Sequence, residues 1–241
     1  GQRAKASAER IYEILDEPPA VDDRHDAVDL IPSGGGISFS DVSFAYGKEA
    51  VGGSQGSENA PLVLEHFNLD VSPGETIAIV GRTGSGKSTI ARLLMRFYEL
   101  QGGKISLDGN DIRSVTQASL RSAISLVPDE PFLFSTSVHE NISYGKPNAS
   151  RAEVEAAARA AQAHEFIVAL DDGYDTVVGE RGYDLSGGQR QRISLARLFL
   201  SDPSVIILDD STSAIDVEIE ERIHGSLKEL LRKRTTIVIA H

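Results

Sequence analysis

The chain has 241 residues, no cysteine and a formal net charge of −12. This length allows one or two domains with a sizeable core, and the absence of thiols excludes disulfides and thiolate zinc sites. The negative charge disfavours nucleic acid or anionic lipid as the main partner. No apolar run approaches the ~20 residues that a membrane-spanning helix needs, and no signal peptide is visible. We therefore expect an excised piece that lacks a membrane domain of its own.

The first 36 residues divide into a predicted helix and a predicted extended linker. Residues 6–19 place three aliphatic side chains on one side of a helix before a Pro-Pro stop: Ile11, Ile14, Leu15, Pro18 and Pro19. Residues 20–36 contain the sequence PSGGG and are predicted to be extended. The helix alone fits an ordinary surface helix equally well, so it does not define a function.

Strand patterns follow the linker. Residues 37–46 and 63–71 alternate between apolar and polar side chains and predict two β-strands. The Gly- and Ser-rich residues 47–60 between them predict a loop without catalytic residues. Residues 104–112 predict a strand, an Asp-Gly turn and a second strand.

A phosphate-binding loop lies between these strand patterns. The sequence GRTGSGKST fits G-x-x-x-x-G-K-[ST], with an apolar strand pattern at 76–80 before it and helical spacing through 89–97 after it. In such a P-loop, backbone N–H groups and the start of a helix surround the phosphates, and glycines permit the dihedrals. We predict that a nucleotide binds at Gly81, Arg82, Thr83, Gly84, Ser85, Gly86, Lys87, Ser88 and Thr89. Lys87 would reach the β- and γ-phosphates, and the Ser88 hydroxyl would ligate Mg²⁺.

A second phosphate-binding surface is predicted about a hundred residues later. Ser150 and Glu153 form a capping-box pattern that opens an alanine-rich helix through about Leu170. The sequence LSGGQ follows and offers a serine and backbone N–H groups at another helix start: Leu185, Ser186, Gly187, Gly188 and Gln189. One nucleotide does not need two such surfaces. The pair makes sense if two chains associate head to tail, each closing the nucleotide of the other.

The sequence VIILDD at 205–210 predicts a buried strand that ends in two carboxylates. Alone, this pattern is more often an ordinary strand end, but downstream of a P-loop it fits a Walker B motif. Asp209 would hold Mg²⁺ directly or through water, and Asp210 would polarise the attacking water. Residues 214–231 predict a further helix, with one apolar row at Ile215, Ile219, Ile223 and Leu227.

With these motifs, the chain resembles the nucleotide-binding domain of ATP-binding cassette (ABC) exporters from about residue 8 to residue 241. The resemblance implies an α/β fold: a RecA-like P-loop NTPase core, an antiparallel β subdomain and an α-helical subdomain at about 131–197. Residues 1–36 would be a linker from an absent transmembrane domain, and 37–241 a nucleotide-binding domain whose C-terminal end is incomplete. ATP would be the substrate and Mg²⁺ the cofactor, at the cytoplasmic face of a membrane.

The resemblance also implies roles for further residues. Tyr46 in FAYG would stack on adenine, although a half-buried strand tyrosine is the alternative. Residues 213–216 match the D-loop, which crosses to the partner chain, and His241 matches the switch histidine that contacts the γ-phosphate. The helix at 6–19 and the X-loop sequence TVVGERG at 176–182 favour an exporter over other cassette ATPases. The segments around Asp129 and Glu180 would couple the domain to the transmembrane domains.

Two departures from the family pattern surround the metal. Asp210 stands where glutamate is usual, which retracts the carboxylate by roughly 1.5 Å, and a misplacement of about 1 Å can cost on the order of a hundredfold in rate. Asp129 stands where the Q-loop glutamine is expected; it can still ligate Mg²⁺ but adds a negative charge. Tolerated drift is one interpretation. We favour a degenerate site, slow in hydrolysis, in one half of a heterodimeric exporter.

Three functions follow from the motifs. The first is a transport-coupled ATPase in which Lys87, Asp210 and His241 are catalytic, partnered by a second nucleotide-binding domain and by transmembrane domains, without nucleic acid. The second is a catalytically idle regulatory module whose LSGGQ completes the site of another subunit. The third is a soluble cassette ATPase in DNA repair or translation, which predicts a coiled-coil insertion or a tandem cassette that the sequence lacks. The first two differ only in the chemistry of Asp129 and Asp210.

Overall fold

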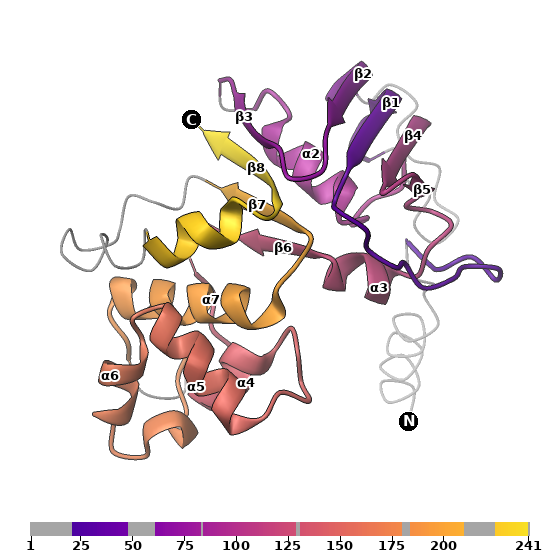
Figure 1. Ribbon diagram of the computed structural model, residues 1–241. Helices are drawn as coiled ribbons and strands as arrows, with labels where there is room; N and C mark the ends of the chain where they lie inside the picture. Colours follow the sequence, from indigo (N-terminus) through magenta and orange to yellow (C-terminus); the bar gives the residue numbers. More distant parts are fainter. Residues whose placement is uncertain are drawn as a thin grey trace, which may run out of the picture.

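The computed structural model describes residues 21–47, 61–82, 84–128, 131–179, 184–209 and 225–240. The predicted helix at 6–19, most of the predicted loop at 47–60 and the first part of the predicted helix at 214–231 lie outside the described residues, whereas 225–231 are helical. Figure 1 shows a β-rich part around β1, β2 and β4, a central sheet around β7, and helices α4 to α7 below that sheet.

The β-rich part is an antiparallel sheet with the strand order β2-β1-β4-β5. Its strands are β1 (Ile37–Phe44), β2 (Leu64–Val71), β4 (Gly102–Leu107) and β5 (Asn110–Asp111). The predicted Asp-Gly turn at 108–109 is confirmed, with φ of 50° and 78°, the positive values that tight hairpin turns require. Gly103 permits a close approach of β4 to β1, because a Cβ there would lie 2.3 Å from the Asp41 carbonyl oxygen.

The central sheet is parallel and has the strand order β3-β8-β7-β6. Its strands are β3 (Thr76–Val80), β6 (Ile124–Val127), β7 (Val205–Asp209) and β8 (Thr235–Ala240). Because parallel strands run in one direction, their carboxyl ends meet at one edge of the sheet. Ligands bind at this edge in open α/β folds. The predicted α/β class, with its antiparallel β subdomain and helical subdomain, is confirmed.

Two hydrophobic clusters lie on the two faces of the central sheet. Val205 and Ile207 of β7 belong to a cluster with α2 (Lys87–Leu94) and α3 (Gln117–Ser122). Their neighbours Ile206 and Leu208 belong to a second cluster with α4 (Val138–Ser143), α5 (Arg151–Ala160), α6 (His164–Val168) and α7 (Gly187–Ser201). Successive strand residues point to opposite faces, so α2 and α7 lie on opposite sides of the sheet (Figure 1).

Side-chain caps begin α4, α5 and α7 of the helical subdomain, whereas α6 has none. The predicted capping box between Ser150 and Glu153 is confirmed at the start of α5, and α4 has another between Ser137 and Glu140. A short 3₁₀ turn, η1 (Gly173–Asp175), follows α6.

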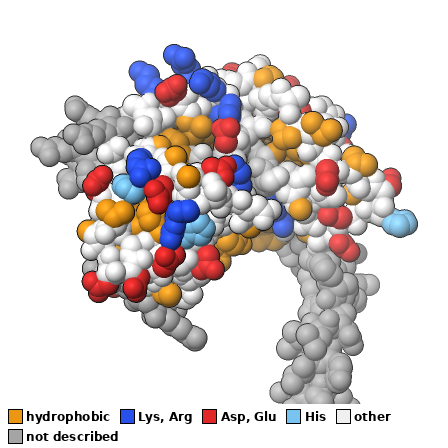
Figure 2. All heavy atoms as spheres, turned by 60° about the horizontal axis from the view of Figure 1, so that its bottom comes forward, with side chains coloured by type: hydrophobic (Ala, Val, Ile, Leu, Met, Phe, Trp, Pro, Cys, Tyr) orange, Lys and Arg blue, Asp and Glu red, His pale blue; other side chains and the backbone are white. Residues whose placement is uncertain are grey.

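Figure 2 shows the underside of Figure 1, where basic and acidic side chains are interspersed with hydrophobic ones.

Two helices are shorter than predicted, because a residue with positive φ ends each of them. The helix predicted through Leu170 ends at Ala160, because Gln162 has a left-handed φ of 54°, and α6 is a separate helix. The helix predicted through Phe97 ends at Leu94, because Arg96 also has a φ of 54°. Phe97 therefore leaves the predicted apolar row and is 43% exposed. A residue in this conformation directly after a helix ends it, and glycine usually occupies the position.

Residues 21–36 contain no helix or regular strand but are bonded to the domain. The Val28 N–H donates to the Ser114 carbonyl at 3.2 Å, and the Leu30 N–H donates to Ser119 Oγ at 2.8 Å. Leu30 is buried against the first cluster. In the ranges that the structure describes, no helix is both long enough and apolar enough to span a bilayer.

Candidate nucleotide-binding site

The P-loop connects the end of β3 to the start of α2. Gly84 and Gly86 have φ of 83° and 89°, which residues other than glycine rarely adopt. The Lys87 side chain is 5% exposed, and its ammonium donates to the carbonyl oxygens of Gly81 at 2.6 Å and Arg82 at 3.1 Å. The lysine thus folds back along its own loop, and its charge is held next to the loop backbone.

Backbone N–H groups at the start of α2 have no side-chain cap among the described residues. Its N-cap is Gly86, no side chain caps it, and no acidic residue lies in its first turn. Four other helices, α3, α4, α5 and α7, are capped by hydroxyl side chains: Thr116, Ser137, Ser150 and Ser186. An uncapped helix start attracts an anion through its N–H groups and its positive dipole end. Together with the buried Lys87, it suits a polyphosphate.

Tyr46 lies beside the P-loop helix. Its hydroxyl is 2.9 Å from Thr89 Oγ1 and accepts from Arg92 Nη1 at 3.4 Å. Its ring packs edge-on against Phe44 and Tyr98, with centroid distances of 4.9 and 5.1 Å. A cleft of about 320 Å³ brings six of the predicted nucleotide-binding residues together with two others, but the described Gly81, Arg82 and Ser85 do not line it. Its lining is Tyr46, Val63, Gly84, Gly86, Lys87, Ser88, Thr89 and Arg92.

Val63 and Arg92 were missed by the sequence analysis. Arg92 could have been found, because it lies four residues after Ser88 and so on the same helix face. Val63 had no signal, because its contact with Gly86 joins segments that are distant in sequence. A Cβ on Gly86 would lie 3.2 Å from the Val63 carbonyl oxygen, so this glycine also permits a close approach of the chain before β2 to the P-loop.

The carboxyl edge of the central sheet brings further predicted residues to the P-loop. Val80, which precedes Gly81, pairs with Ala240 of β8, and Asp209 at the end of β7 pairs with Ile239. Ser88 is half-buried at the second position of α2. The predicted D-loop at 213–216 and five predicted residues lie outside the described residues: Thr83, Asp129, Glu180, Asp210 and His241.

The oxygen ligands that are described suit Mg²⁺. Ser88 and Asp209 offer a hydroxyl and a carboxylate, and Mg²⁺ prefers oxygen ligands. Within the described ranges, no group of three or more His, Asp or Glu side chains could hold a metal ion without help.

The LSGGQ segment begins α7, on the face of the sheet opposite to α2. Ser186 is the N-cap: its Oγ accepts from the Gln189 N–H at 3.3 Å, and Gln189 Oε1 accepts from the Ser186 N–H at 2.9 Å. A side chain at Gly187 would meet nothing within 4 Å, so the backbone there is open to an approaching molecule. Leu185 is buried in the helical subdomain and anchors the segment.

A groove of about 260 Å³ runs beside this segment. It is lined by Pro131, Phe132, Leu133, Gly179, Asp184, Leu185 and Arg190. The residues after the predicted Q-loop pair with the first part of the predicted X-loop, because Ser137 and Val177 form an antiparallel bridge. The Phe132 side chain is 63% exposed at the groove. Segments next to the two predicted coupling elements thus meet at one surface.

Comparisons with known proteins identify the family of this chain. The family described as ABC transporter matches residues 64–213. An ATP-dependent lipid A-core flippase of Desulfotalea psychrophila is 46% identical over 240 residues, which cover 100% of this chain and 40% of that protein. A putative multidrug export ATP-binding/permease protein of Bacillus subtilis is 45% identical over 236 residues, which cover 98% of this chain and 39% of that protein.

A solved structure of a bacterial Atm1-family ABC exporter with ATP bound has a TM-score of 0.86 and 39% sequence identity, covering 100% of this chain and 40% of that chain. The chain thus spans about two fifths of the length of these relatives. Its sequence motifs, its fold and its relatives agree, and the chain belongs to the ABC transporter family as an ATP-binding domain.

Proposed function

We propose that this chain binds Mg-ATP at the P-loop and pairs head to tail with a second nucleotide-binding domain, closing around ATP to drive export through transmembrane domains. The observation that carries the proposal is the uncapped start of α2 beside the buried Lys87. The printed names of the relatives describe a flippase and a multidrug export protein, which supports a role in export. The domain would lie at the cytoplasmic face of a membrane.

Different residues would contact the adenine, the phosphates and the metal ion of the bound nucleotide. Tyr46 would stack on adenine, and Lys87 would exchange the carbonyl oxygens of Gly81 and Arg82 for phosphate oxygens of ATP. When bound, Mg²⁺ would neutralise charge between the β- and γ-phosphates, and Ser88 and Asp209 would hold it, with Asp129 as a further candidate. Asp210 would orient the attacking water, and His241 would contact the γ-phosphate.

Pairing of two chains is supported by the two faces of the central sheet. In one chain, α2 packs on one face and α7 on the other, so the LSGGQ segment lies away from the P-loop cleft. Although Ser186 already caps α7, the positive dipole end of this longer helix and the open backbone at Gly187 would still favour phosphate of a second chain. A second chain turned end to end would bring residues 185–189 of its own LSGGQ segment to the ATP held here.

The site of this chain would hydrolyse ATP slowly. Asp210 is one methylene shorter than glutamate, and Asp129 replaces glutamine at the same metal. The chain would then be the degenerate half of a heterodimer, with its LSGGQ completing the competent site of a different chain. The same two substitutions favour a second candidate function, an idle regulatory module that binds ATP without turnover.

Coupling to the membrane part would use the groove beside the LSGGQ segment. Segments 131–138 and 176–179 meet there, and they continue from Asp129 and toward Glu180. The exposed Phe132 offers an apolar contact for a transmembrane domain. The groove is also lined by Leu185 of the LSGGQ segment and by Arg190, which follows it. Movement at the nucleotide would therefore reach the groove and the LSGGQ segment together.

The proposal is tested by measuring Mg-ATP binding and phosphate release by the purified chain. We expect saturable binding with turnover at least a hundredfold below about 1 s⁻¹, the lower end of ordinary enzymes. Absence of binding would contradict the proposed function. Brisk turnover with ATP-dependent dimerisation of the chain alone would support an ordinary homodimer instead of a degenerate half. Complete absence of phosphate release, with intact binding, would favour the regulatory module.

The role of Tyr46 has its own test. Tyr46→Ala should weaken ATP binding by roughly tenfold, because stacking of a base on an aromatic ring is worth about 1–3 kcal/mol. Tyr46→Phe is the matched control: it keeps the ring but loses the hydroxyl contact with Thr89. Titration with a fluorescent ATP analogue distinguishes the two. Equal weakening by both variants would show that the hydroxyl, and not the ring face, matters.

A further inference from the structure

A buried arginine ends the P-loop helix. Arg96 is 2% exposed and lies in the left-handed conformation directly after α2, where its N–H donates to the Leu93 carbonyl and the Phe97 N–H donates to the Arg92 carbonyl. Glycine is the usual residue at such a helix end, because a Cβ is strained there. A strained residue that persists points to a role for its side chain.

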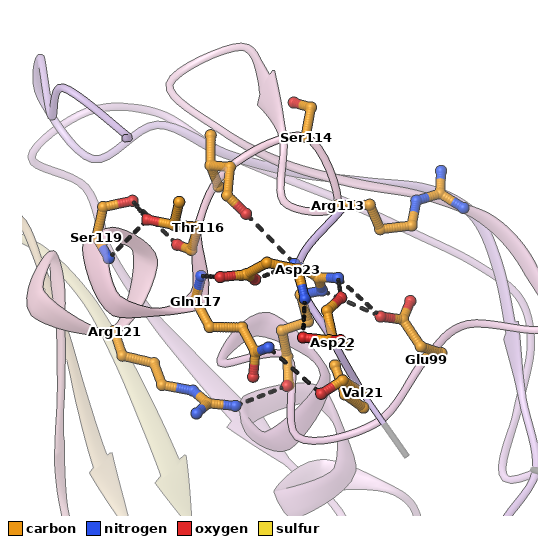
Figure 3. A network of polar contacts seen from close by, with 12 residues as sticks. Val21, Asp22, Asp23, Glu99, Arg113, Ser114, Thr116, Gln117, Ser119 and Arg121 are labelled. Carbon is orange, nitrogen blue, oxygen red and sulfur yellow. Dashed lines mark hydrogen bonds and ion pairs between the residues drawn. The ribbon is translucent and has the colours of Figure 1, made fainter. Parts of the chain in front are cut away.

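The Arg96 guanidinium joins three segments of the chain, and Figure 3 shows its partners Asp22, Asp23 and Glu99 close together. Nη2 donates to the Asp22 carbonyl at 2.6 Å, and Nη1 donates to Asp23 Oδ1 at 3.2 Å. The same Nη1 donates to the Val115 carbonyl at 3.3 Å, and Nε donates to Glu99 Oε1 at 3.1 Å. The planar fork of arginine can serve these acceptors together, which the single ammonium of a lysine cannot.

Asp23 makes the complementary connection. Its two carboxylate oxygens accept from the Gln117 N–H, at 3.0 and 3.2 Å, in the first turn of α3. A negative charge at a helix start is favourable, so Asp23 is stabilised by α3 as well as by Arg96. Arg121 of α3 in turn donates to the Met95 and Arg96 carbonyls at the end of α2.

Residues 21–30, here called the strap, are thus fastened at several points. Beyond Asp23, the Thr116 N–H donates to the Val28 carbonyl at 3.0 Å, and Leu30 is buried. The strap precedes the whole domain in the chain. The strap is attached to the domain where α2 ends.

We propose that Arg96 is a positioning residue that latches the strap to the P-loop helix, so that docking of the strap and binding of Mg-ATP favour each other. This inference rests on the proposed function of the P-loop. Lys87 begins α2 and Arg96 follows its end, about 13 Å away along the axis at 1.5 Å per residue. One short rigid helix therefore carries both attachments. A state that fixes one end favours the other, and the coupling must be reciprocal.

The test compares Asp23→Asn with Asp26→Asn in the full chain. Both variants remove one negative charge from the strap, but Asp26 is exposed and its side chain makes no hydrogen bond or ion pair in the described structure, so it is the matched control. Hydrogen exchange is read at the Val28 and Leu30 amides, without and with saturating Mg-ATP, and ATP affinity is measured in parallel. These amides are bonded only while the strap is docked.

We expect Asp23→Asn to raise nucleotide-free exchange at these amides by about tenfold, because it breaks a charge-assisted hydrogen bond of a buried guanidinium. Mg-ATP should slow their exchange in the wild-type chain. ATP affinity should fall by roughly threefold or more in Asp23→Asn, and Asp26→Asn should match the wild type in all three measurements. Reciprocity requires that the factor by which Mg-ATP favours the docked strap equals the factor by which the docked strap favours Mg-ATP binding.

A second variant, Arg96→Gly, guards against loss of the fold. Glycine suits the left-handed conformation, so it removes the guanidinium while it relieves the backbone. It should loosen the strap and weaken ATP binding as Asp23→Asn does, and Arg96→Lys should restore only part of either effect.

Two outcomes separate failure of this inference from failure of the proposed function. If the chain binds Mg-ATP but strap exchange is unaffected by it, and Asp23→Asn binds ATP as the wild type does, the latch is only structural and the inference is overturned. If the wild-type chain binds no Mg-ATP, the proposed function fails and the coupling with it. The nucleotide-free exchange comparison still decides whether Arg96 and Asp23 hold the strap.

Discussion

Replacing Lys87 with methionine should reduce the affinity for Mg-ATP by at least a hundredfold. The Lys87 side chain is almost fully buried at the start of α2 and lines the cleft, so its ammonium would contact the proposed phosphates. Each charge-assisted hydrogen bond contributes about 1.5–3 kcal/mol, and loss of two such bonds corresponds to roughly two to four powers of ten. Calorimetric titration with Mg-ATP measures the change.

The substitution has a second effect that a control must separate. Lys87 also donates to the Gly81 and Arg82 carbonyls, so methionine removes bonds that hold the loop. Thermal unfolding of the variant shows whether the domain remains folded. Lys228→Met is the matched control, because it removes the same charge from an exposed position on another helix. An unchanged affinity in folded Lys87→Met would place the nucleotide elsewhere and refute the proposed site.

Asp210→Glu should raise ATP turnover on the order of a hundredfold while ATP affinity stays nearly constant. Glutamate extends the carboxylate by one carbon–carbon bond, roughly 1.5 Å, toward the water that it would orient. Errors of about 1 Å in the placement of a reacting group can cost a hundredfold in rate. The release of phosphate from Mg-ATP is measured for both proteins at saturating nucleotide.

Two further variants make this experiment decisive. Asp171→Glu serves as the control for a longer carboxylate at an exposed position. The double variant Asp210→Glu, Asp129→Gln removes the second departure and should show the larger gain if the added charge of Asp129 also impedes the metal. If the wild type already hydrolyses ATP rapidly, or if neither the single nor the double variant exceeds it, the degenerate-site hypothesis loses its support.

The sequence predicted what depends on neighbouring residues. The P-loop, the strand that ends at Asp209 and the capping box at Ser150 each lie within a few consecutive residues, and each was located correctly. The parallel sheet followed from the resemblance. The roles of Asp129, Asp210 and His241 stay predictions, because these residues lie outside the described structure.

The sequence did not predict features that depend on distant contacts or on strained backbone. Nothing local marks Gln162 or Arg96 as left-handed, since both residues are good helix formers, and both predicted helices were therefore extended too far. The extended linker was predicted without its attachments, because Asp23 meets Gln117 and Arg96 only in the folded chain. Such contacts join residues more than seventy positions apart.

The placement of α2 and α7 on opposite faces of one sheet limits how copies of this domain can assemble. In the proposed head-to-tail pair, a two-fold axis would engage the P-loop side and the LSGGQ side of both members at once, so association would close at two and would not continue into a filament. Each nucleotide site of that pair would draw half of its parts from each chain. In a mixed pair, damage to Lys87 of one chain and to Ser186 of the other falls in the same site and leaves the second site whole. Two defective chains could thus complement one another, whereas the same two lesions in a single chain would disable both sites.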